Sequence, residues 1–317
     1  MVPSPGPGVS DLETAGSNSM GSILESVSSF ASITTTSGLL IELQKLSEAG
    51  VAIASRRYTL EYGGEVPRDG NCLFQALAVA MGSFETASEV RERCVSRARR
   101  LQSSSDLPTG VEQRIANLYT PDLSSCWGVE CVQEHKLIVR VDDVPGAQQE
   151  IQARVENGLD YNTAASTLYQ DMGRPVNDLD SWADYQAIEG SMDDEHAIIS
   201  LQFVEEGLLT VDVAEGQGAF GDDLAIEFLA TEYQREIFVV QAHGGDSSLE
   251  EDPALFFLPH RPLGQDGKPG TPLFPPLFLL MKGSDWRGAG ADHYEPLLTQ
   301  KRMDEGCCEP YITLDDV

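Results

Sequence analysis

The chain has 317 residues, and 41% of them are hydrophobic, enough for a sizeable core in one large domain or two ordinary ones. It carries 51 acidic against 21 basic residues, a formal net charge of −30, so Coulomb repulsion opposes binding to nucleic acid and to anionic membranes. Six cysteines are too few for a disulfide scaffold at this length.

The sequence shows neither a membrane span nor a secretory signal. No apolar run reaches the roughly 18 residues that a span needs. The first residues lack the basic and apolar regions of a signal peptide. We therefore expect a cytoplasmic protein with reduced thiols; a nuclear location, or delivery into a host cell by another kind of signal, stays open.

The N-terminal region, residues 1–55, is expected to be disordered or partly helical. Residues 1 to about 20 are rich in Pro, Gly and Ser, a composition typical of disordered segments. Residues 38–50 (GLLIELQKLSEAG) place leucines at helical spacing before a closing glycine, which predicts a short amphipathic helix.

A strand, a turn and a helix are predicted next. Residues 56–62 (RRYTLEY) alternate between apolar and polar side chains as a strand does. The turn PRDGN follows, and an apolar run then predicts a helix from Cys72 to about Met81. Gly82 is a natural end for this helix, because glycine readily adopts the left-handed conformation of a helix C-terminus.

A second helix is predicted over residues 87–101. Thr86 and Glu89 have the spacing of a capping box, in which each side chain bonds the backbone of the other residue. The residues predicted to face inward recur at helical spacing: Val90, Cys94, Ala98 and Leu101.

Residues 102–218 are expected to form an insertion or a subdomain. Acidic residues and loop formers separate helix-like pieces at 111–119, 147–157 and 161–171 from a strand-like piece at 136–141. The sequence leaves the role of this region open.

Helices and buried strands alternate after Gly221. Residues 221–234 predict a helix capped by Asp222 or Asp223. Apolar runs then predict buried strands at 236–242, 276–282 and 293–298, with a Gly- and Pro-rich loop over 259–276. This order indicates an α+β, or mixed α/β, domain in which a small central sheet is flanked by helices. Residues 301–317 form an acidic tail.

Cys72 is the first candidate for chemistry. A thiol attacks as a thiolate, and a helix N-terminus favours the thiolate through its dipole and its unpaired N–H groups. The preceding turn of Asp69, Gly70 and Asn71 offers further N–H groups that could bind an oxyanion, and Gly70 lets the backbone approach closely. The alternative is a small buried cysteine that happens to follow a turn.

His293 is the best-placed base among the five histidines. It begins a predicted strand, and Glu295 projects to the same side two residues later because strand side chains alternate. Glu295 can then orient the imidazole as the third member of a triad does. Asp292 is a rival for that role, and His243 is a second choice for the base.

Other candidate sites are weaker. Cys126, Cys131 and His135 give a C-x4-C-x3-H spacing without a clear fourth ligand, so we expect no metal and no cofactor. His196 is expected at a solvated helix start. Trp182 is expected to be a packing residue.

Three stretches occur here in the order typical of a known family. They are DGNCLFQALA (69–78), GDDLAIEFLA (221–230) followed by IFVVQ (237–241), and HYEPLL (293–298). In this the chain resembles the ovarian tumour (OTU) family of cysteine proteases, most of which are deubiquitinases. The resemblance covers roughly residues 56–300, and 102–218 match poorly. It implies a papain-like OTU fold and a catalytic domain over 56–300.

The resemblance assigns roles position by position. Cys72 matches the family nucleophile and His293 its general base. Asp69 matches the acidic residue at the start of the motif, where it shapes the turn and the oxyanion site. Glu295 stands where the family usually has Asn or Asp, and Phe220 stands where a Trp is common.

The implied activity is hydrolysis of isopeptide bonds at the C-terminus of ubiquitin, so the implied partners are ubiquitin and polyubiquitin conjugates. The acidic balance suits ubiquitin's basic face. Two alternatives stay open. One is an OTU-fold module that binds ubiquitin without cutting, which the Glu295 departure favours. The other is a processing protease acting on a polyprotein or another ubiquitin-like modifier.

Overall fold

The computed structural model describes residues 27–33, 39–46, 52–103, 110–119, 133–203, 209–214, 217–242, 255–263, 270–282 and 293–299. The chain divides into two compact units, Met1–Thr59 and Leu60–Val317. The first unit contains β1 (Val27–Ile33), β2 (Leu39–Leu46) and the beginning of β3 (Ala52–Tyr62). The predicted disorder of residues 1–20 lies outside the described residues.

The helix expected over residues 38–50 is wrong, because the described part of this stretch, Leu39–Leu46, is strand β2. Ile41 and Leu43 alternate with Glu42 and Gln44, so the sequence fits a strand as well as a helix. Antiparallel pairing with β1, in which Phe30 lies opposite Glu42, settles the choice.

The main sheet of the second unit runs in the order β3-β11-β10-β8-β9. Strands β8 and β10 are parallel, and the other described neighbours are antiparallel. The bounds are β8 Ile237–Ala242, β9 Leu255–His260, β10 Leu277–Lys282 and β11 His293–Thr299. Three predicted strands are thus confirmed. The loop predicted over 259–276 starts too early, because Pro259 and His260 are the last two residues of β9. Pro259 is tolerated there because β9 lies at the sheet edge.

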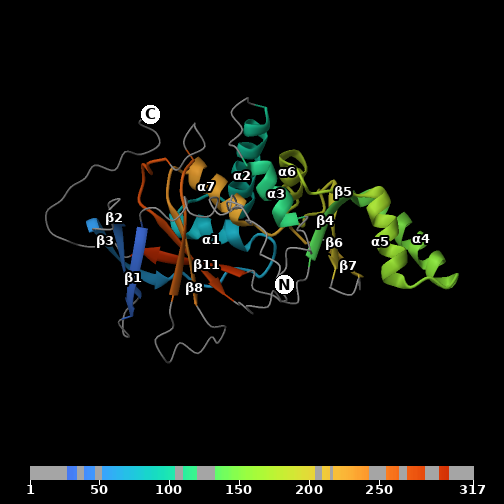
Figure 1. Cartoon of the computed structure of the whole chain (residues 1–317), viewed down its shortest axis with the longest axis horizontal. Coiled ribbons are helices and arrows are strands. Elements are labelled where there is room, and N and C mark those ends of the chain that lie inside the picture. Colours follow the sequence, from blue (N-terminus) through green and yellow to red (C-terminus); the bar gives the residue numbers. More distant parts are fainter. Residues whose placement is uncertain are drawn as a thin grey trace, which may run out of the picture. The chain divides into compact units, whose positions relative to one another are not determined.

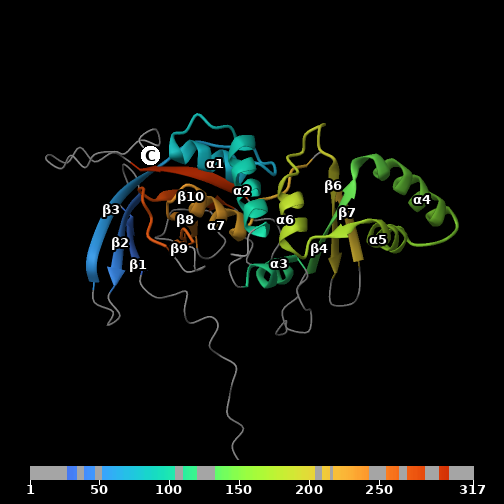
Figure 2. The ribbon, with the colours of Figure 1, turned by 90° about the horizontal axis from the view of Figure 1, so that it is seen from above.

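Two of the described helices pack on this sheet, α1 (Cys72–Met81) and α7 (Asp223–Glu232), and α2 (Ala87–Gln102) packs against both of them. Helix α1 packs on β10 and β11, and α7 packs on β8 and β9 (Figures 1 and 2). Side chains alternate along each strand, so they are divided between the two faces of the sheet. Ile237 and Leu277 join the helices in one core, while Phe238 and Phe278 stack on the opposite face with ring centroids 5.3 Å apart.

Three helix-boundary signals in the sequence are confirmed, at Gly82, at Thr86 and Glu89, and at Asp222. Helix α1 ends at Gly82, whose φ of 62° is left-handed. Helix α2 begins with the complete capping box of Thr86 and Glu89, and its four predicted inward residues are buried. Asp222 caps α7 by accepting a hydrogen bond from the Ala225 N–H group at 2.8 Å.

Residues 102–218 contain a second, antiparallel sheet in the order β5-β4-β6-β7. Its strands are β4 Gln133–Arg140, β5 Arg174–Pro175, β6 His196–Phe203 and β7 Leu209–Ala214. The helices of this region are α3 Val111–Tyr119, α4 Val144–Glu156, α5 Tyr161–Met172 and α6 Leu179–Gln186, with a 3-10 turn at Val141–Asp143.

The second sheet contributes to two cores. Leu137 and Ile199 pack with α4 and α5 in a separate hydrophobic cluster. Ile138 and Ile198, on the other face, belong to the main core together with α1, α2 and α7. Figure 2 shows α4 and α5 beside β4, β6 and β7. The expected mixed α/β class, with sheets flanked by helices, is confirmed, whereas the predicted division into N-terminal region, catalytic domain, insertion and tail stays a prediction.

Candidate active site

Cys72 is the first residue of α1 and directly follows a tight turn that begins at Asp69. Two hydrogen bonds close this turn. The Asn71 N–H group donates to Asp69 Oδ1 at 2.8 Å, and the Cys72 N–H group donates to the Asp69 carbonyl oxygen at 3.2 Å. The Asp69 side chain therefore shapes the turn. Both N–H groups would have to leave Asp69 to bind an oxyanion, so that role of the turn stays a prediction.

The turn packs tightly against the segment that precedes α7. A Cβ atom on Gly70 would lie 2.2 Å from the carbonyl oxygen of Gly218, so only glycine fits without a backbone shift. The Ala219 N–H group donates to the Ile188 carbonyl oxygen at 2.8 Å, and the Asn71 side chain donates to the Glu189 carbonyl oxygen at 3.1 Å. Long-range contacts therefore fix the conformation of the turn.

His293 begins β11, and Glu295 lies on the same side of the strand, as the alternation predicts. His293 Nε2 is 3.5 Å from Glu295 Oε1, and both side chains are buried. The other ring nitrogen, Nδ1, is also buried and has no hydrogen-bond partner among the residues that the structure describes. The imidazole can therefore face Glu295 through one nitrogen and accept a proton at the other.

Helix α1 and strand β11 are direct neighbours in the fold (Figure 1). The helix that begins with Cys72 thus packs on the strand that begins with His293. Cys72 is buried, with 2% of its surface exposed. The packing brings the elements that carry the predicted nucleophile and base together, and the pairing of the two side chains stays a prediction.

Lys282 and Tyr62 join this cluster, although neither residue was selected in the sequence analysis. Lys282 ends β10 opposite His293 in the strand register, and its Nζ forms an ion pair with Glu295 Oε2. Lys282 Nζ also donates to the Tyr62 hydroxyl group at 3.4 Å and lies 4.8 Å from the centre of its ring. A lysine closing an otherwise apolar strand was the one available signal.

The charge of Lys282 compensates that of the buried Glu295 carboxylate. Burial alone would lower the pKa of Lys282, but the hydrogen bond and the charge of Glu295 outweigh it, so this pKa is raised. The pKa of Tyr62 is also raised, by partial desolvation and by the neighbouring Glu295. The Glu295 carboxylate therefore lies beside His293 through Oε1 and beside the Lys282 ammonium group through Oε2.

The weaker candidates do not form sites in the described part of the chain. The His135 ring packs on Phe203 with centroids 4.6 Å apart, and burial lowers the pKa of this histidine. His196 begins strand β6 rather than a helix, which corrects the sequence-based expectation. Trp182 is fully buried and donates to Asp222 at 2.8 Å, as a packing residue does. Predictions about Cys126, Cys131, Asp292 and His243 fall outside the described residues.

Neither a metal cluster nor a membrane-spanning helix is found within the described ranges. No three His, Cys, Asp or Glu residues there gather as metal ligands would. None of the helices described is long and apolar enough to cross a bilayer.

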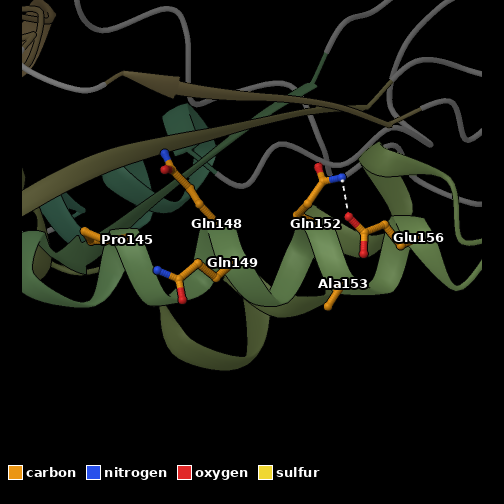
Figure 3. A pocket seen from close by; sticks show the side chains of 6 residues that line it. All are labelled: Pro145, Gln148, Gln149, Gln152, Ala153 and Glu156. Atoms are coloured by element: carbon orange, nitrogen blue, oxygen red, sulfur yellow. Dashed lines mark hydrogen bonds between the residues drawn. The ribbon is translucent and has the colours of Figure 1, made fainter.

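A hollow of about 460 Å³ lies away from these residues, along one side of α4 (Figure 3). Gln152 Nε2 donates to Glu156 Oε1 across its edge at 3.2 Å. All the residues that line the hollow belong to this single helix, so the hollow is a mostly polar stretch of the helix surface. The lining residues are Pro145, Gln148, Gln149, Gln152, Ala153 and Glu156. It contains no nucleophile or base for the chemistry considered above.

Comparisons with known proteins add a distant structural likeness. No protein-family model matches the sequence, and no curated protein matches it either. Among solved structures, the chain is similar to an OTU deubiquitinase from Wolbachia pipientis wMel bound to ubiquitin, with 12% identity and a TM-score of 0.34. The match covers 76% of this chain and 96% of the other. Similarity at this level does not establish a shared fold or activity.

Proposed function

We propose that the protein is an OTU-like thiol hydrolase that cleaves isopeptide bonds at the C-terminus of ubiquitin. The observation that carries the proposal is the packing of α1 on β11, which joins the element that starts with Cys72 to the one that starts with His293. The DGNC and HYE stretches at those two starts are the residues in which the chain resembles the OTU family.

The local environment of each group supports its assigned role. Cys72 lies at a helix N-terminus, where the dipole favours a thiolate. His293 has a carboxylate beside Nε2 and a buried Nδ1 that is not hydrogen bonded to any described residue. This is the arrangement in which one nitrogen is oriented and the other exchanges a proton with the nucleophile.

The reaction has two stages. Cys72 Sγ attacks the carbonyl carbon of the ubiquitin C-terminal glycine, and the lysine amine leaves with a proton supplied by the imidazolium of His293. A water molecule, deprotonated by His293, then attacks the resulting thioester, releasing the ubiquitin carboxylate and restoring the thiol. Glu295 stabilises the imidazolium, and Lys282 compensates the carboxylate when the imidazole is neutral.

The burial of Cys72 suits a narrow substrate. With 2% of the residue exposed, only a thin segment without bulky side chains can reach the sulfur atom. The Gly-Gly end of ubiquitin is such a segment. The formal charge of −30 also favours encounter with ubiquitin's basic face.

The test is reaction of the purified protein with ubiquitin that carries a thiol-reactive electrophile at its C-terminus. We expect a covalent adduct on the wild type and none on the Cys72→Ala variant. Cys94 is the internal control, because burial raises the pKa of its thiol and it should stay unlabelled.

The other outcomes separate the alternatives. Labelling of the wild type by an electrophilic ubiquitin-like modifier but not by ubiquitin would point to a processing protease for that modifier. Absence of any adduct, together with measurable binding of ubiquitin, would point to a non-catalytic binding module. Either result would overturn the proposed function.

A further inference from the structure

Arg91, on helix α2, is buried in contact with the turn that precedes Cys72. Only 1% of its surface is exposed. Its Nη2 atom donates to the carbonyl oxygens of Gly70 at 2.7 Å and Ala219 at 2.8 Å. Its Nε atom donates to Asn71 Oδ1 at 3.0 Å, and its Nη1 atom donates to the Gln186 carbonyl oxygen at 2.7 Å. One side chain thus binds three separate segments.

Helix α1 is a further contact of the guanidinium group. The group lies over the ring of Phe74, 4.1 Å from its centre, and Phe74 is fully buried two residues after Cys72. Arg91 therefore touches the structure on both sides of Cys72, through Gly70 and Asn71 before it and through Phe74 after it.

The charge of Arg91 is placed at an energetic cost. All four hydrogen-bond acceptors are uncharged oxygen atoms. Burial lowers the pKa of Arg91 to about 10, so the side chain is still cationic near neutral pH. A buried charge generally stabilises a fold less than a well-packed apolar side chain, so stability alone does not account for an arginine here.

We infer that Arg91 is a positioning residue that fixes Cys72 relative to His293 by holding the Asp69–Asn71 turn against α6 and the segment before α7. The inference rests on the proposed use of Cys72 as the nucleophile. The guanidinium group carries five donors on three nitrogen atoms in a fixed planar arrangement, so it can reach carbonyl groups on separate segments, whereas a lysine ammonium has three donors on a single nitrogen atom. Movement of the turn would displace the first residue of α1 from the strand that carries His293.

The experiment compares the full-length wild type with Arg91→Lys. This substitution keeps the charge but loses most of the fixed donors. The matched control is Arg93→Lys, on the same helix, where the wild-type side chain is 49% exposed and pairs with Glu85. Alkylation of Cys72 by iodoacetamide is followed as a function of pH by mass spectrometry, and kcat and KM are measured on ubiquitin carrying a C-terminal fluorogenic amide.

We expect Arg91→Lys to move the pH dependence of Cys72 alkylation upward by about one pH unit, because a displaced thiolate loses its pairing with the imidazolium. We also expect kcat to fall by about tenfold or more, with KM changed less than twofold. Arg93→Lys should match the wild type in both measurements. A residue that acts only on stability would lower Tm and leave the alkylation profile of the folded protein unchanged.

Asn71→Ala keeps the inference testable if Arg91→Lys does not fold. It removes the Nε acceptor, together with the hydrogen bond from the Asn71 side chain to the Glu189 carbonyl oxygen, on a partly exposed residue. The other three hydrogen bonds of Arg91 remain, so alkylation should shift in the same direction by a smaller amount. An unchanged profile in the folded variants, or a change in KM alone, would overturn the inference. A wild-type Cys72 that reacts only as an ordinary thiol would instead overturn the proposed function, and the positioning role with it.

Discussion

The turn that ends at Cys72 is held mainly through backbone groups, whereas the start of β11 is linked to its surroundings at His293 by charged side chains. At the turn, Arg91 donates to the carbonyl oxygen of Gly70 and also to those of Gln186 and Ala219, which lie in the segments packed against the turn. At the strand, the contacts are those of Glu295 with His293 and Lys282.

This difference indicates what each region tolerates. Backbone bonds depend on where the chain runs, so the turn is sensitive to any change that shifts the chain, such as an added Cβ atom. Side-chain contacts depend on charge, so the strand region is sensitive to pH and to substitutions that alter charge while the backbone stays in place. Substitutions in the turn should therefore act mainly through shifts of the backbone, and substitutions at the start of β11 mainly through changes in charge.

Removing the base should give the largest effect. For His293→Ala we expect kcat on a fluorogenic ubiquitin amide to fall by about 10³-fold, because the proton transfers lose their catalyst. The variant should still fold, so we expect only a small change in Tm. His196→Ala, at the start of β6, is the control and should retain full activity. Equal activity of the wild type and His293→Ala would exclude His293 as the base.

A single added methyl group should disrupt the turn. In Gly70→Ala the Cβ atom would meet the Gly218 carbonyl oxygen at 2.2 Å, so we expect a loss of about 3 kcal/mol in the free energy of unfolding. Gly82→Ala is the control: its φ is +62° and nothing lies within 4 Å, so only backbone strain of about 1 kcal/mol is expected. Denaturant unfolding measures both, and equal losses would contradict the close packing of the turn.

The ion pair behind His293 can be tested with a double-mutant cycle. Lys282→Met leaves the buried Glu295 carboxylate without its cation, and we expect a loss of about 2 kcal/mol in the free energy of unfolding, reduced from a fully buried pair because Lys282 is partly exposed. Adding Glu295→Gln should recover part of this loss, because an uncharged amide needs no cation. Strictly additive losses in urea unfolding would show that the two side chains are not coupled.

Replacing His260 should give the smallest effect. It should change the pH dependence of stability and leave the pH dependence of activity unchanged. Burial lowers the pKa of His260, in β9, below its ordinary value of 6.5. On acidification the unfolded chain therefore binds a proton before the folded protein does. The resulting contribution to stability is present above pH 6.5 and is lost as the pH falls toward the folded pKa.

We expect His260→Gln to flatten the decline of Tm below pH 6.5 by an amount equivalent to about 1 kcal/mol or less. The pH dependence of ubiquitin cleavage above pH 6.5 should be the same in this variant, because His260 belongs to neither region of the site. A changed activity profile would link β9 to the site.

Several features of the fold follow from local sequence and were predicted correctly. The capping box at Thr86 and Glu89, the terminal Gly82 and the cap at Asp222 each act on neighbouring residues, so they can be read without knowledge of the fold. The alternation that places His293 and Glu295 on one side of β11 is equally local.

Tertiary contacts decided the features that local patterns leave ambiguous. Residues 39–46 fit a helix or a strand, and pairing with β1 selects the strand. Pro259 argues against a strand, but an edge position in the sheet removes the objection. Residues 209–214 were not predicted to form a strand, and they do so as the neighbour of β6.

What the sequence by itself determined was the identity of the candidate groups, because helix starts and strand alternation place Cys72, His293 and Glu295 through interactions a few residues apart. Only the tertiary structure decided what surrounds them. Lys282 meets Glu295 through the register of β10 and β11, and Arg91 reaches Gly70 and Ala219 from sequence separations of 21 and 128 residues. Such contacts depend on how the whole chain packs, and no local pattern in one sequence specifies them.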